Sequence, residues 1–488
     1  MSLSSIRREW LANPTREMLA GAVATFALIP EVIAFSFAAG VDPQVGLFAS
    51  FVIGIVIAFS GGRPAMISAA AGSVALVAAP LVHAHGLPYL LAAGLLAGIM
   101  QIVFGLLRLG VLMRFVSKSV RTGFVNALAI LIFGAQVPHI IGGGVVGYAF
   151  LAAGLMLIYL VPRITTALPS PLICVVVLTV ASMVLKLPVL TVADLGRLPD
   201  SLPFFAWPDV PLNVETLRII AAPALAIAMV GLLESMMTAS VVDDLTDTPS
   251  SKNRECAGLG LANAASSLFG GIAGCGMIGQ TISNVKYGGR GRLSTLFAGA
   301  FLLVLMVLLK PWVSQVPVAA LVAIMIMVSI DTFDWSSVRK LVVHPKISSA
   351  VMLATVAVTV ATSNLALGVM VGVLLSGVFF TFKVARLLHV ERELDAGAKQ
   401  ILYRVSGQVF FASADMFVEA FDMGDIADMN VKIDVSRAHF WDITAVTALE
   451  KVVQRFKTHG AKVEVIGVNE ASSTLIERLD SSAAIGEA

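Results

Sequence analysis

The sequence has few charged residues and no recognisable catalytic motif. Charged residues make up 13% of its 488 positions, about half of the ~25% usual in globular proteins, whereas 58% are apolar. This shortage of charge excludes an ordinary soluble fold and indicates a chain that crosses a membrane many times. No nucleophile–base pair or metal motif stands out, so we expect neither an enzyme nor a bound cofactor. The net charge of +2 says nothing about an acidic partner, and we expect no nucleic-acid partner for a membrane protein of this kind.

Cysteine and histidine are also scarce. Cys174, Cys256 and Cys275 lie in apolar or junction sequence without C-x-x-C spacing, so we expect small, buried, unpaired side chains. The seven histidines form no ligand cluster, and no metal site is predicted. Residues 1–14 lack the apolar core of a signal peptide and are expected to be a cytoplasmic N-terminal segment.

Long apolar runs dominate the first 385 residues. Because about 20 apolar residues span a bilayer, these runs predict fourteen membrane segments within a transport domain at 15–385. The third and tenth runs are too short or too interrupted to cross as ordinary helices. The segments are expected near 15–39, 44–60, 64–82, 88–107, 111–135, 147–162, 170–186, 216–240, 254–272, 276–288, 293–310, 315–330, 347–363 and 366–384.

Lysine and arginine gather at every second connection between these segments. Such an asymmetry marks the cytoplasmic side, so we expect both termini in the cytoplasm of a cell with the protein in its inner (plasma) membrane. The longest opposite connection, about 187–215, is mainly acidic. The cationic connections contain Arg7, Arg8 and Arg16; Arg63; Arg108 and Arg114; Arg163; Lys252 and Arg254; Lys286, Arg290 and Arg292; and Arg339, Lys340 and Lys346.

After residue 386 the composition becomes that of a small soluble domain. Residues 386–398 read as a charged linker. The runs "ILYRVSGQVFFAS", "VKIDVS" and "AKVEVIGV" predict three strands, and "ADMFVEAFDM", "DITAVTALEKVVQRFKTHG" and "NEASSTLIERLD" predict helices. Strands alternating with helices predict an α/β domain at 399–482.

The two interrupted segments resemble each other. "GGRPAMISAAAGS" begins at Gly61 and "GIAGCGMIGQTISN" at Gly271; aligning Met66 with Met277 places them 211 residues apart. Seven segments precede the long outer connection and seven follow it, so the halves at about 15–186 and 216–385 insert with opposite orientation. Paired interrupted helices in an inverted repeat mark a binding site near the middle of the membrane.

The physical chemistry of a helix start explains why a site would need half a helix. The first turn exposes unpaired N–H groups and carries roughly half a positive charge, so two such ends bind an anion without a lysine or arginine. Small residues let the backbone approach the ligand. The alternative is that the small residues only allow close helix packing.

Two acidic residues lie inside predicted membrane segments. Glu31 follows Pro30 in the first segment, and Glu234 lies deep in the eighth, which is the first of the second half. A charge at the bilayer centre costs about 2.5–3.5 kcal/mol even on a lenient scale, so such residues usually border a transport pathway. Thr238, four residues after Glu234, shares its helical face.

These features resemble the sulfate permease (SulP) family of anion transporters over about residues 10–480. "LIPEVIAFSFAAGVDPQVGLFASF" is similar to the family's first two helices, and "VKIDVSRAHFWDITAVTALE" to its STAS domain. The resemblance implies a seven-plus-seven inverted repeat with core and gate domains, usually as a homodimer. The chain looks most like bacterial members, which include a fumarate–proton symporter.

The resemblance also implies the site residues. Glu31 and Glu234 would couple transport to protons, since a carboxyl group removed from water can hold a proton. The implied anion-binding residues are Phe35, Ala70, Ala71, Gly72, Thr238, Ile278, Gly279 and Gln280.

Two departures from the family pattern bear on coupling. Many animal members have glutamine where Glu31 stands and Ser-Arg where Gly279-Gln280 stands, which weakens an anion-exchange function here. Bicarbonate members use sodium near an acid and threonines, but the third-segment threonine corresponds to Ala71. We therefore expect proton-coupled symport of a carboxylate or oxyanion, with a dicarboxylate such as fumarate favoured, and a cytosolic regulator acting on the STAS domain. The alternatives are sodium-coupled bicarbonate or sulfate uptake, an anion exchanger or channel, and a nucleobase–proton symporter.

Overall fold

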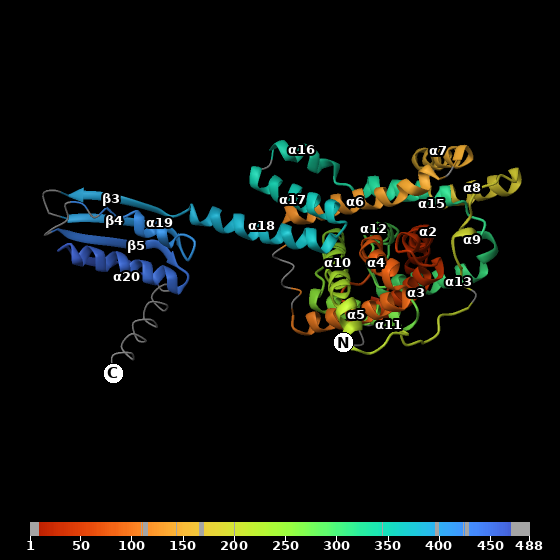
Figure 1. Cartoon of the computed structure of the whole chain (residues 1–488), viewed down its shortest axis with the longest axis horizontal. Helices are drawn as coiled ribbons and strands as arrows, with labels where there is room; N and C mark the ends of the chain where they lie inside the picture. Colours follow the sequence, from red (N-terminus) through yellow and green to blue (C-terminus); the bar gives the residue numbers. More distant parts are fainter. Residues whose placement is uncertain are drawn as a thin grey trace. The chain divides into compact units, whose positions relative to one another are not determined.

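The computed structural model of the chain consists of two units, Met1–Val373 and Leu374–Ala488 (Figure 1). The boundary lies within helix α18 (Leu365–Ala385), whereas the sequence placed it after residue 385. The residues that the structure describes are 9–108, 110, 116–142, 144–164, 170–199, 201–343, 345–395, 400–422, 424 and 429–469.

Each of the fourteen predicted membrane segments contains a helix. Among the described helices, eight are long and apolar enough to cross a membrane and four shorter ones are apolar. The expected fold class is confirmed. The fifth predicted segment, at 111–135, corresponds to helix α6, which lies further along the chain, from Lys118 to Ile141. Residues 111–115 lie outside the described residues.

The helices of the first unit form two groups, visible in Figure 1. The first group packs around α2 and α3 and takes helices from both halves of the chain. Its members are α2 (Pro14–Ala38), α3 (Pro43–Ser60), α5 (Leu87–Leu106), α10 (Val214–Thr246), α11 (Lys252–Leu268) and α13 (Arg292–Leu308). The second group consists of α6 (Lys118–Ile141), α7 (Gly144–Leu160), α8 (Ser170–Leu185), α15 (Val318–Thr332) and α17 (Lys346–Thr362).

The two interrupted segments meet as a pair of short antiparallel strands. Strand β1 (Ser68–Ala70) pairs with β2 (Gly274–Gly276), and helices α4 (Gly72–His85) and α12 (Ile278–Lys286) follow them. The third predicted segment, near 64–82, therefore contains a short strand before its helix, which the sequence analysis did not predict. The predicted alignment of the two segments was wrong in register, because corresponding elements lie 206 residues apart, not 211.

Glycine makes this strand pairing possible. A Cβ added at Gly274 would lie 2.0 Å from the carbonyl oxygen of Ala69, which is closer than any side chain permits. Beyond the strands, the Met277 N–H donates to the carbonyl of Ile67 at 2.8 Å. The two halves of the chain are thus joined by backbone hydrogen bonds where each segment is interrupted.

Two buried carboxylates bind backbone N–H groups across the halves. Glu17, at the start of α2, accepts from Arg290 at 2.7 Å, from Gly291 at 2.8 Å and from Ser294 at 3.2 Å. Glu255, in α11, accepts from the N–H groups that precede β1. In that contact the Gly62 and Arg63 nitrogens lie 2.7 and 3.0 Å from Glu255 Oε2.

The second unit has a four-stranded sheet in the order β3-β4-β5-β6. The three predicted strands are confirmed, and α20 (Ile443–Thr458) lies beside the sheet (Figure 1). The predicted linker at 386–398 was wrong in part, because β3 (His389–Asp395) forms there and pairs antiparallel with β4. The helix expected at "NEASSTLIERLD" lies outside the described residues. The other elements are β4 (Gln400–Val409), α19 (Ala414–Glu419), β5 (Asn430–Phe440) and β6 (Lys462–Ile466).

We predict that Glu17→Ala lowers the thermal stability of the membrane unit. The substitution leaves three backbone N–H groups without their acceptor, and each buried unsatisfied group costs about 1–3 kcal/mol. The melting temperature of the purified protein, followed by intrinsic fluorescence, is the measurement. Glu215→Ala, at an exposed position in the first turn of α10, is the control and should leave it unchanged.

We also predict that a chain ending at Arg386 folds, and that its membrane unit melts at the same temperature as in the full-length protein. This end point keeps α18 whole and removes all of β3, whereas a cut at residue 393 would leave an unpaired half strand. Size-exclusion chromatography and thermal melting of the truncated form provide the test. Aggregation of the shorter chain would show that the membrane unit needs the second unit to fold.

Candidate functional site

The candidate site lies where α4 and α12 begin. Because β1 and β2 run antiparallel, the two helices start from opposite ends of the same three-residue ladder. Ala71 and Met277 are the N-caps, and neither side chain caps its helix. The first-turn N–H groups of both helices are therefore left for a ligand or for neighbouring side chains.

Glu234 lies against this junction. Oxygen Oε2 of its carboxyl group accepts a short hydrogen bond from the Ser73 hydroxyl, in the first turn of α4. The Cys275 thiol of β2 also donates to it, with Sγ 2.9 Å away. Glu234 lies deep among protein atoms, yet its side chain is not fully covered.

Thr238 and Ser235 hold β2 in place. The Thr238 hydroxyl lies 2.9 Å from the carbonyl oxygen of Glu234 and 3.0 Å from that of Gly276. The N–H of Gly276 donates to Ser235 Oγ at 2.9 Å. The Thr238 hydroxyl is thus engaged with backbone, which favours a role in shaping the site over direct contact with an anion.

The side chains of Asn263 and Gln101 form a buried pair of amides next to β2. Asn263 accepts from the Gly274 N–H at 2.8 Å and donates to the Gln101 side chain at 2.9 Å. Both amide side chains are fully buried. They satisfy backbone groups that a break in a membrane helix would otherwise leave unpaired.

The predicted small residues form the wall on the α4 side. Ala70 and Ala71 are buried, and the Ala70 N–H donates to Ser50 Oγ at 3.2 Å. Gly72 faces the ring of Phe35, where an added Cβ would lie 2.7 Å from Cε1. Phe35 is itself 3% exposed, so its ring packs closely on the start of α4.

The α12 side is more open. Ile278 is half-buried, and an added Cβ at Gly279 would meet no atom within 4 Å. Gln280 is buried, and its side-chain amide lies close to the Glu31 carboxyl group. Space remains beside Gly279.

The structure therefore groups the predicted residues into two clusters. Glu31 and Gln280 form one, and Glu234 and Thr238 form the other, next to β2. Ser73 and Cys275 were missed. Ser73 follows the small-residue run directly and could have been found once the helix start was placed at Gly72.

The three cysteines are free and buried, as expected. The sequence treated Cys275 only as a small apolar residue; its contact with Glu234 corrects that interpretation. Within the part of the chain that the structure describes, no group of three or more His, Cys, Asp or Glu residues could hold a metal ion.

Comparison with known proteins agrees with this architecture. The sulfate permease family matches residues 15–150 and 144–355, and the STAS domain family matches 390–485. The chain is 49% identical to the putative sulfate transporter YbaR of Bacillus subtilis, over 97% of this chain and 99% of that one. It is 28% identical to the bicarbonate transporter BicA of Picosynechococcus, over 96% and 90% of the two chains.

Solved structures show the same fold. The transmembrane domain of a cyanobacterium bicarbonate transporter BicA matches with a TM-score of 0.66 and 25% identity, covering 75% of this chain and 98% of that one. Murine Solute Carrier 26 family member A9 matches with a TM-score of 0.83 and 17% identity, covering 98% and 89%. On this evidence the chain belongs to the sulfate permease family and is an anion transporter with a C-terminal STAS domain.

Proposed function

We propose that the chain carries out proton-coupled uptake of a small oxyanion, with the anion bound between the starts of α4 and α12. The observation that carries the proposal is that Glu31 of α2 lies close to the Gln280 side chain in the first turn of α12. No ion pair of the described chain involves Glu31 or Glu234. A proton is therefore the simplest counter-charge for either carboxylate.

The first turns of α4 and α12 supply the anion-binding groups. Their backbone N–H groups and the positive ends of the helix dipoles favour negative charge. Gly279 leaves room beside them, and the Gln280 amide can donate to an oxyanion or to Glu31. A site without a lysine or arginine binds its anion weakly enough to release it on the other side.

Coupling follows from charge repulsion between the anion and Glu31. An ionised carboxylate next to the site disfavours a second negative charge, so the anion binds better when Glu31 holds a proton. Because linkage is reciprocal, the bound anion in turn favours proton binding at Glu31. Anion and proton would then cross together.

The names of the relatives bear on which anion is carried. YbaR is called a putative sulfate transporter and BicA a bicarbonate transporter, and both names favour a compact inorganic oxyanion. A dicarboxylate such as fumarate remains the hypothesis from the sequence. An uptake screen over sulfate, bicarbonate, chloride and dicarboxylates in proteoliposomes distinguishes these substrates.

Sodium coupling is the second candidate, and one contact favours it. From the sequence we expected no sodium site, because Ala71 has no hydroxyl group. Ser73, two residues later, places a hydroxyl directly on Glu234. A carboxylate and a serine oxygen are hard oxygen donors, the type that a small hard cation binds. The Glu234 cluster therefore has the chemistry of a sodium site.

The setting of the transporter completes the proposal. Lysine and arginine at alternate connections support cytoplasmic termini in the plasma membrane. A homodimer and a cytosolic regulator of the STAS domain are proposed on the family resemblance alone.

We predict that Glu31→Gln abolishes uphill anion uptake driven by an inward proton gradient, because the amide cannot carry the proton. Downhill exchange of labelled anion should survive, which shows that the protein is folded. The measurement is radiotracer accumulation in proteoliposomes with the proton or the sodium gradient set separately. Undiminished proton-driven accumulation by this variant would contradict the role given to Glu31.

The same assay separates the two candidates. If sodium is the coupling ion, a sodium gradient alone drives uptake in the wild type, and Ser73→Ala and Glu234→Gln both weaken the sodium dependence. If protons are the coupling ion, Ser73→Ala leaves the proton dependence intact.

We predict that Gly279→Leu raises the half-saturating anion concentration at least about tenfold, equivalent to ~1.4 kcal/mol of lost binding free energy. The leucine would occupy the open space beside the helix start. Gly134→Leu in α6 is the matched control, because an added Cβ there also meets nothing within 4 Å, at an exposed position away from α12. Equal effects of the two substitutions would show that the small residues only pack helices.

A further inference from the structure

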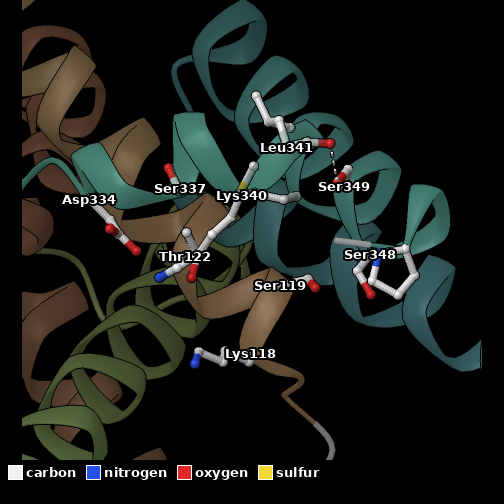
Figure 2. Close-up of a pocket in the computed structure, with 11 residues that line it drawn as sticks. Lys118, Ser119, Thr122, Asp334, Ser337, Lys340, Leu341, Ser348 and Ser349 are labelled. Carbon is white, nitrogen blue, oxygen red and sulfur yellow. Dashed lines mark hydrogen bonds between the residues drawn. The ribbon is translucent and has the colours of Figure 1, made fainter. Parts of the chain in front are cut away.

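A pocket lies away from the candidate anion site, at the end of the membrane unit where α6 begins (Figure 2). It has a volume of about 270 Å³. Its walls come from the first turns of α6 and α17 and from α16 (Trp335–Val343), a short helix after α15. None of the residues assigned to anion transport lines it.

The pocket carries a net positive charge. Lys118 and Lys340 line it together with one acid, Asp334. Lys118 forms no ion pair within the described chain, while Lys340 donates to Ser336 Oγ at 2.6 Å. The Asp334 carboxylate accepts from the Ser336 hydroxyl, and Figure 2 places it at one end of the pocket.

Hydroxyl groups complete the lining. Ser119 and Thr122 come from α6, and Ser348 comes from the first turn of α17. None of the three side chains hydrogen-bonds another described residue, so they are available to a ligand. Lysine ammonium groups, free hydroxyls and the first turn of a helix together match the charge and the acceptor oxygens of a phosphate group.

The exposed apolar side chains of helix α16 indicate that the phosphate belongs to a lipid. Its apolar side chains Trp335, Val338 and Val343 are 64%, 51% and 79% exposed, although Arg339 and Lys340 lie on the same short helix. An amphipathic helix with a tryptophan and basic residues lies in the membrane interface, with its apolar side in lipid. The pocket beside it therefore opens at the depth of lipid headgroups.

We propose that this pocket binds the phosphate headgroup of an anionic phospholipid, with Lys118 and Lys340 as its cations. The bound headgroup would join α6, α16 and α17. Two of these, α6 and α17, belong to the helix group that does not contain β1 and β2. The lipid would thus attach that group to one membrane surface.

The test measures lipid binding to the purified full-length protein by native mass spectrometry, with phosphatidylglycerol and phosphatidylcholine as probes. We expect Lys118→Met and Lys340→Met each to weaken phosphatidylglycerol binding about fivefold, and the double variant about 25-fold, as for ~1 kcal/mol per lysine. Lys383→Met, an exposed lysine in α18 that does not line the pocket, should have no effect. Unchanged melting temperatures confirm that the variants are folded.

A second arm separates a lipid from a soluble phosphate. Inorganic phosphate and glycerol phosphate are added as competitors at millimolar concentration. Phosphatidylglycerol binding that resists them and depends on both lysines supports the proposal. Equal binding of the two lipids, no loss in the double variant, or lysine-dependent binding of the soluble phosphates alone would overturn it.

Discussion

The pairing of β1 with β2 is the interaction on which the membrane unit depends. Two helices must stop in the middle of the membrane so that their first turns are free, and the backbone exposed at each interruption needs partners there. Each interruption supplies those partners for the other, at Ser68–Gly276, Ala69–Cys275 and Ala70–Gly274. This pairing requires glycine in β2, because there is no room for a Cβ at Gly274. The same pairing places Cys275 and Ser73 on Glu234.

Charged groups serve two separate purposes in this unit. Near the ends of the helices, Glu17 and Glu255 accept from backbone N–H groups of the opposite half and so fix the connections. Within the membrane segments, the described residues beside Glu31 and Glu234 are the neutral Gln280, Ser73 and Cys275. The first pair binds backbone that connects the two halves, whereas the second pair lies beside the starts of α12 and α4. This difference in position explains why the second pair is the candidate for coupling.

The sequence predicted the architecture well because apolar length and repeated small-residue tracts are strong signals. It predicted the residues around the site, but not how they pair. The strand interruption was missed because three-residue strands of serine, alanine, glycine and cysteine carry no strand pattern, and this shifted the repeat alignment by five residues. Strand β3 was missed because charged residues alternate along an edge strand as they do in a linker. The Ser73 contact with Glu234 depends on that register and could not be predicted without it.

The strand pair also limits how the site can open. The starts of α4 and α12 are joined by backbone hydrogen bonds, and both are hydrogen-bonded to α10. The two helix starts therefore cannot move apart from each other without breaking the hydrogen bonds between β1 and β2. A site of this kind changes the compartment it faces only if its whole helix group moves as one body past the other. The anion would then travel with its binding groups, and the barrier to transport would lie in the sliding surface between the two helix groups, where α2 meets α15.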